Sequence, residues 1–131
     1  MDFPKGLLYT KTHEWVRAEG EQVTIGITEY AADELGDVVY VELPASGREL
    51  RAEEVFGTVE SVKAVSDLVS PVAGEVVEAN PDLTGSPEQV NVDPYGKGWM
   101  VKVKLSSAQA LSDLMDSDGY AAFVAEEGSD S

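Results

Sequence analysis

Apolar and polar residues alternate over several short runs, which is the pattern of half-buried β-strands. The alternation is clearest over residues 22–27, and a second run, 38–43, ends at Pro44. Further runs predict strands at residues 14–16, 55–62, 64–68, 74–78 and 99–105. Many short strands separated by turn residues favour a small sandwich or barrel over a sheet that alternates with helices.

One short internal helix is predicted between the strands at 22–27 and 38–43. Thr28 can cap its N-terminus, because a threonine hydroxyl accepts a backbone N–H of the first turn. Gly36 can end it, because glycine adopts the left-handed conformation common after a helix. The internal helix is therefore expected to be one or two turns long.

Near the C-terminus, the spacing of the apolar residues changes to that of an α-helix. Ser106 and Gln109 have the spacing of a capping box, and one apolar face follows, formed by Ala108, Leu111, Leu114 and Met115. Residues 116–119 predict a break, and the apolar residues at 120–124 predict one more turn. The small, polar and acidic residues 125–131 predict a flexible tail. The sequence thus indicates a single domain with a core over residues 9–124 and a C-terminal helix.

Composition narrows the class of function. With 131 residues the chain is about one domain long. Nine Lys and Arg against 25 Asp and Glu give a net charge of −16, which disfavours nucleic acid and anionic membranes as partners. No apolar run is long enough to span a bilayer, residues 1–5 do not resemble a signal peptide, and there is no cysteine. We expect a cytoplasmic protein, and a monomer because no apolar stripe stands out.

Lys63 is the only cationic residue between positions 52 and 96, a stretch that holds nine carboxylates. It lies between two predicted strands, so a hairpin turn would expose its ammonium. A solvated turn or edge lysine is the ordinary interpretation, because such lysines discourage aggregation. The alternative is a single target amine for a modifying enzyme that recognises an acidic hairpin.

The segment ESVKAVSD at 60–67, followed by residues 71–80, resembles the lipoyl-attachment segment of the glycine cleavage system H protein. The resemblance extends in order from residue 9 to residue 124, through the stretches 9–16, 26–28, 35–44, 90–99 and 111–123. It implies a mostly β fold: a small hybrid barrel-sandwich of the lipoyl and biotinyl carriers, with a short internal helix and a C-terminal helix.

The resemblance implies a carrier and not an enzyme, with no catalytic residue and no metal. Lys63 would carry lipoate as N6-lipoyllysine, attached by a lipoyl-attaching enzyme. The implied partners are glycine decarboxylase, which uses pyridoxal phosphate, an aminomethyltransferase that uses tetrahydrofolate, and dihydrolipoamide dehydrogenase. The aminomethyl group of glycine would travel on the lipoyl arm between the first two, and the third would reoxidise the dithiol.

The resemblance also assigns roles to three carboxylates. Glu60 and Asp67 flank Lys63 and would be recognised by the lipoyl-attaching enzyme, although both could equally be solvated strand residues. Glu14 resembles a position near the cleft that receives the loaded arm, where it could pair with the protonated amine; a solvated strand position is the alternative. His13 has no partner for a metal site and is expected to be structural, beside Trp15.

Three other kinds of carrier and one kind of enzyme are alternative interpretations of the sequence. Lipoyl domains of 2-oxoacid dehydrogenase acyltransferases usually have aspartate before the lysine, and biotinyl carriers have methionine on both sides, whereas this chain has Val62 and Ala64. An H-like relay that supplies lipoate to other enzymes would use the same Lys63, so the sequence leaves it open. An acidic hydrolase is disfavoured, because neighbouring carboxylates on a strand face opposite ways.

Overall fold

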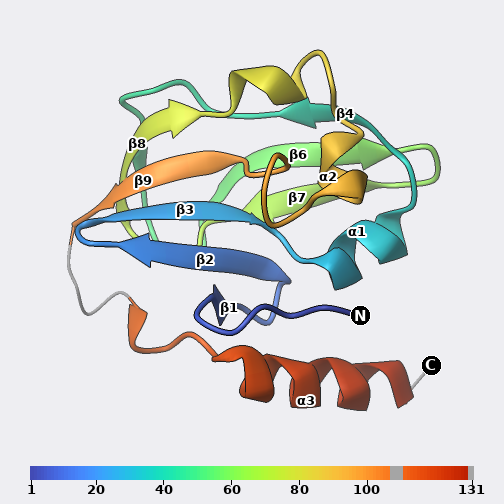
Figure 1. Cartoon of the computed structure of the whole chain (residues 1–131). Helices are drawn as coiled ribbons and strands as arrows, with labels where there is room; N and C mark the ends of the chain where they lie inside the picture. Colours follow the sequence, from blue (N-terminus) through green and yellow to red (C-terminus); the bar gives the residue numbers. More distant parts are fainter. Residues whose placement is uncertain (107–110, 130–131) are drawn as a thin grey trace.

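The structure is a computed structural model that describes residues 1–106 and 111–129. Two antiparallel sheets lie face to face (Figure 1). The larger sheet has the order β1-β2-β3-β9-β8-β5, formed by Leu8–Tyr9, Glu14–Glu19, Gln22–Ile27, Val101–Leu105, Gly74–Ala79 and Glu49–Leu50. The smaller sheet has the order β4-β6-β7, formed by Val38–Glu42, Val55–Ser61 and Val65–Val69.

Every strand predicted from alternation is present, so the mostly β fold is confirmed. The ends differ by a few residues: β2 continues to Glu19, and β9 begins at Val101. The two-residue strands β1 and β5 were not predicted, because two residues are too few to show alternation. No helix within the described residues is long and apolar enough to cross a membrane.

The internal helix is also confirmed as α1, Glu29–Leu35. The Thr28 hydroxyl accepts the N–H of Ala31, and Gly36 follows with a φ of 79°. Two shorter elements, the 3₁₀ turn η1 at Pro81–Leu83 and the one-turn helix α2 at Gln89–Val92, were not predicted. They are too short to carry a helical period.

The C-terminal prediction was wrong in its placement of the helix. Residues 112–114 form a turn and a bend, and Met115 pairs with Tyr9 through two backbone hydrogen bonds of 2.8 and 2.9 Å. Helix α3 is Ser117–Ser129 and begins inside the predicted break. The reason is Asp116, which caps the helix: its side chain accepts the N–H of Gly119 at 2.8 Å.

Positions 107–110, with Ala108 and Gln109, lie outside the described residues. The flexibility expected of residues 125–131 stays a prediction.

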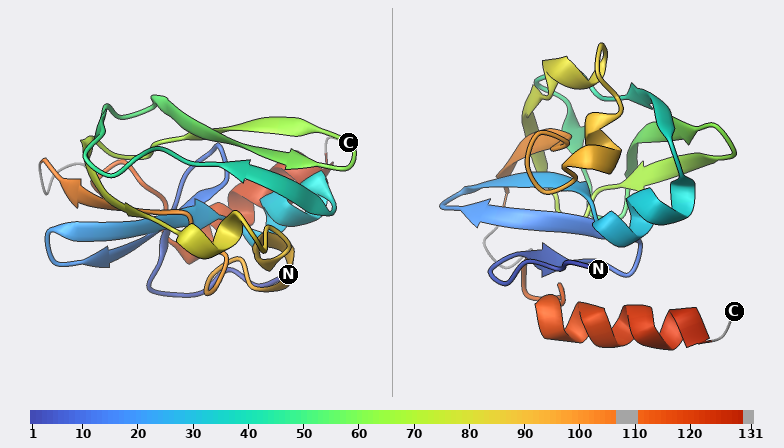
Figure 2. Two further views of the ribbon diagram at one scale, coloured as in Figure 1. Left: turned by 90° about the horizontal axis from the view of Figure 1, so that it is seen from above. Right: turned by 45° about the vertical axis from the view of Figure 1, so that its right-hand side comes forward.

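Two apolar clusters hold the fold together. The main cluster combines buried residues of both sheets, among them Ile25 of β3 and Val59 of β6. The second joins the N-terminal segment to α3, where the rings of Tyr9 and Tyr120 stack at 4.7 Å. Because α3 lies outside the two sheets (Figure 2), the second cluster is what fixes this helix to the body of the protein.

Candidate functional site

Lys63 lies at the tip of the β6–β7 hairpin, which projects at one side of the molecule (Figure 1). Its side chain is exposed. Ser61 shapes the turn: its hydroxyl accepts the N–H groups of Lys63 at 3.3 Å and Ala64 at 3.1 Å, and its own N–H donates to the Ala64 carbonyl at 2.8 Å. The turn therefore holds Lys63 in an exposed position on a backbone fixed by hydrogen bonds.

The hairpin tip is seated on the connection between α1 and β4. The Val62 N–H donates to the carbonyl of Asp37 at 3.0 Å, and the Lys63 side chain lies over Gly36. Asn91 of α2 fixes this connection, since its amide donates to the Gly36 carbonyl at 2.8 Å and accepts the N–H of Val38 at 2.8 Å. In the sequence, residues 90–91 contributed only to the family resemblance, and the role of Asn91 in positioning the hairpin tip was not predicted.

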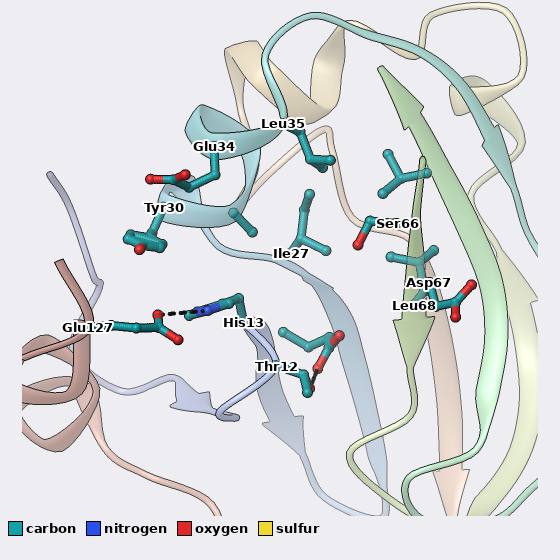
Figure 3. A pocket seen from close by; sticks show the side chains of 13 residues that line it. Thr12, His13, Ile27, Tyr30, Glu34, Leu35, Ser66, Asp67, Leu68 and Glu127 are labelled. Atoms are coloured by element: carbon teal, nitrogen blue, oxygen red, sulfur yellow. Dashed lines mark hydrogen bonds and ion pairs between the residues drawn. The ribbon is translucent and has the colours of Figure 1, made fainter. Parts of the chain in front are cut away.

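A pocket of about 320 Å³ lies beside the same hairpin (Figure 3). Its walls come from residues 12–14, from α1, from β6 and β7, and from Glu127 of α3. Ser66 and Leu68 of β7 face the pocket (Figure 3). One hairpin therefore carries Lys63 at its tip and forms part of a cavity wall on its inner face.

Glu14 is in the wall of this pocket and is 2% exposed, so the interpretation as a solvated strand residue is wrong. One carboxylate oxygen accepts the hydroxyls of Thr10 and Thr12, and the other accepts the N–H of Val69 at 3.3 Å. Burial is the largest influence and raises the pKa of Glu14, although these hydrogen bonds oppose it. The second oxygen retains acceptor capacity.

Protonation of Glu14 is expected to stabilise the fold. Because its pKa in the folded protein lies above the ordinary 4.5, the folded state binds this proton more tightly than the unfolded chain. The stabilisation is present below the unfolded pKa and is lost as the pH rises through the folded one. Wild type should therefore gain unfolding free energy relative to Glu14→Gln as the pH falls from about 7 to about 4.5, measured by urea denaturation. A constant difference would contradict this.

Glu60 and Asp67 lie on the outer, solvent-facing side of the hairpin. Glu60 is paired with Val65, and Asp67 with Thr58, so the register puts both carboxylates on one face. Asp67 borders the pocket, but its carboxylate points away from the cavity (Figure 3). The structure therefore brings Glu60 and Asp67 to one surface beside Lys63 and places Glu14 on the other side of the hairpin.

His13 connects the pocket to α3. Its backbone has a φ of 72°, and its Nδ1 is 2.8 Å from the hydroxyl of Tyr120, which also bonds Thr28 at 2.8 Å. Its Nε2 is 3.2 Å from a carboxylate oxygen of Glu127 (Figure 3). Desolvation lowers the pKa of His13, and Glu127 opposes this. His13 thus joins two ends of the chain at the pocket wall, a role that its place beside Trp15 in the sequence did not reveal.

Metal binding has no support in the described residues, which contain no cluster of three or more histidine, cysteine, aspartate or glutamate side chains able to hold an ion. A two-sheet β fold with an exposed lysine at a hairpin tip is the arrangement of carrier proteins that present a covalently attached group. Comparison with known proteins identifies the kind of carrier.

The family model described as Glycine cleavage H-protein matches residues 7–127. The chain is 54% identical over 124 residues to the glycine cleavage system H protein of Bacteroides fragilis, covering 95% of this chain and 98% of that one. It is 56% identical over 126 residues to that of Rubrobacter xylanophilus, covering 96% and 98%. A crystal structure of a glycine cleavage system H protein from Mycobacterium marinum superposes with a TM-score of 0.84 at 36% identity, covering 96% and 99%. The chain belongs to the glycine cleavage H-protein family.

Proposed function

We propose that this protein is the lipoyl carrier of a glycine cleavage system and that Lys63 bears the lipoyl group. The observation that carries the proposal is the exposed amine of Lys63, held at the tip of a hairpin within a chain that belongs to the family. The names of its relatives favour glycine cleavage over lipoate relay. The protein would act as one carrier domain, as a monomer in the cytoplasm, with no catalytic group of its own.

The site fits a lipoyl group because Lys63 is exposed and the Ser61 turn holds its backbone. Attachment requires the neutral ε-amine to attack an activated lipoyl carbonyl, which forms an amide, expels the activating group and releases a proton. When bound, the lipoyl group supplies a disulfide that opens to accept the aminomethyl group. The chain has no cysteine, so it cannot trap the resulting thiols in a mixed disulfide with itself.

The pocket beside the hairpin is the proposed resting place of the aminomethyl-loaded arm. Glu14 offers an oxygen with spare acceptor capacity to the protonated amine, and Glu34 and Glu127 add negative charge to the same walls. Exclusion of water there would protect the amine from loss. Because the Asp67 carboxylate points out of the cavity, we assign it, with Glu60, to recognition by the lipoyl-attaching enzyme.

The proposed partners are glycine decarboxylase, aminomethyltransferase and dihydrolipoamide dehydrogenase. The test is reconstitution: the lipoylated protein is mixed with these three enzymes, glycine, tetrahydrofolate and NAD, and NADH is measured. We expect NADH formation that depends on glycine and on prior lipoylation. Failure with partners that are active on another H protein, together with efficient transfer of the lipoyl group to a 2-oxoacid dehydrogenase carrier, would support relay instead.

Salt should weaken these encounters. With a net charge of −16, the carrier is expected to dock on basic surfaces, and exposed charges are screened over about 10 Å at 0.1 M salt. Raising the salt from about 0.05 M to about 0.5 M should therefore raise the KM for the carrier severalfold, with less effect on kcat. Glycine decarboxylase assays over this range provide the measurement, and an unchanged KM would contradict electrostatic docking.

A further inference from the structure

The outer face of the β4-β6-β7 sheet carries an ordered set of side chains next to Lys63. Strand pairing aligns Tyr40, Glu60 and Val65 in one row across the three strands. The next row on the same face consists of Glu42, Thr58 and Asp67. The intervening positions on β4 and β6 point into the core and are buried. The outer face is therefore a surface separate from the inner wall that contributes to the pocket.

Two of the three residues in the row nearest the hairpin tip are apolar although they face solvent. Tyr40 is 50% exposed and Val65 is 64% exposed, and Val62, the neighbour of Lys63 in the turn, is 71% exposed. No hydrogen bond to the Tyr40 hydroxyl occurs within the described part of the chain. Single exposed apolar residues are ordinary, but three gathered around one functional lysine form a patch suited to protein contact.

Charge defines the chemistry of a partner for this patch. Glu42, Glu60 and Asp67 lie on the same face, and Lys63 is the only cationic residue between positions 52 and 96. A complementary surface has an apolar centre and a rim of lysine or arginine. Such a rim would pair with the carboxylates without competing for the amine of Lys63.

The length of the Lys63 side chain before and after modification decides which partner must contact this face. Before modification, Lys63 can enter an active site only if that enzyme closes over the residues beside it, because a lysine side chain is short. After modification, the long lipoyl arm allows later partners to dock elsewhere and still reach its end. The enzyme that attaches the group is therefore the one partner obliged to contact the surface around the tip.

We propose that the outer-face patch, defined as Tyr40, Val62 and Val65 with Glu42, Glu60 and Asp67, is the docking surface for the lipoyl-attaching enzyme. The proposal rests on Lys63 being the lipoylation site. It adds that apolar contacts from β4 and β7, and not only the carboxylate near the lysine, determine how tightly the unmodified carrier binds.

The test is the steady-state rate of lipoylation by a purified lipoate–protein ligase supplied with lipoate and ATP. The double variant Tyr40→Thr/Val65→Thr removes the apolar groups and keeps residues that favour strands. We expect the KM for the carrier to rise about tenfold or more, with kcat within about twofold. The matched control is Val55→Thr, since Val55 is 44% exposed at the other end of the same hairpin.

The outcomes separate this inference from the proposed function. A double variant with a KM within about twofold of wild type, or an equal rise in the Val55→Thr control, would overturn the docking surface. If the double variant loses its cooperative melting transition, the triple variant Glu42→Gln/Glu60→Gln/Asp67→Asn tests the same surface instead. This triple variant should flatten the dependence of the KM for the carrier on salt. A wild type that is lipoylated but inactive in glycine cleavage would overturn the proposed function alone.

Discussion

Replacing Lys63 by arginine is expected to abolish lipoylation and to reduce glycine-dependent NADH formation to the background of the assay. The guanidinium of arginine remains charged at any pH a protein tolerates, so it does not supply the neutral nitrogen that amide formation needs. Lys63 is exposed, so the fold should be unaffected. Intact mass after incubation with ligase, lipoate and ATP is the measurement: wild type gains one lipoyl increment and the variant gains none.

A second arginine variant controls for the loss of a lysine as such. Lys97 is also exposed, but it lies in a loop after α2, away from any hairpin tip. Lys97→Arg should gain the same mass increment as wild type and should retain its activity. A lipoyl increment on Lys63→Arg would place the attachment at another lysine and would contradict the proposed site. Matching circular dichroism spectra would show that the three proteins share one fold.

Replacing Trp15 by alanine should cost about 3–5 kcal/mol of unfolding free energy. The Trp15 ring is fully buried and lies over Gly26, its partner across β2 and β3, where a Cβ atom would come within 2.7 Å of the indole. Its N–H donates to the carbonyl of Pro94 at 2.9 Å. Domains are stable by only about 5–15 kcal/mol, so the loss is a large fraction of the total.

Trp15→Phe is the matched variant, because it keeps an aromatic ring over Gly26 and removes only the hydrogen bond and part of the volume. It should cost about 1–2 kcal/mol. Urea denaturation followed by circular dichroism gives both values. If Trp15→Ala cost no more than Trp15→Phe, the ring would contribute little to the cluster that anchors β1 and α3, contrary to its burial.

The strands could be predicted because each depends on a local pattern. Short runs of apolar and alternating residues located the seven longer strands of the two sheets, although the first of them was predicted only over residues 14–16. The start of the C-terminal helix could not be predicted from the sequence, because Asp116 is equally compatible with the end of one helix and with the N-cap of the next. Only the tertiary contacts of Tyr120, buried against Tyr9, show that the helix begins there.

The site was predictable only in part for a similar reason. Lys63 stands out in the sequence by its isolation among carboxylates, but that isolation alone favours an ordinary solvated lysine, and its assignment as the lipoyl site came from the family resemblance. The outward direction of Asp67 depends on hairpin register, and the pairing shifts between Val55 and Gly57. The contact of His13 with Tyr120 spans 107 residues and leaves no local signal.

The second cluster brings the N-terminal segment and helix α3 to the pocket beside the hairpin. Met1 and Phe3 share a cavity wall with Tyr30, Glu34 and Glu127, and these last three also line the pocket beside the hairpin. An affinity tag fused before Met1 would therefore start next to the place where the loaded arm is proposed to rest. Purification handles or fluorescent labels are better inserted in the exposed loop at 45–47, which keeps the pocket and its approach clear.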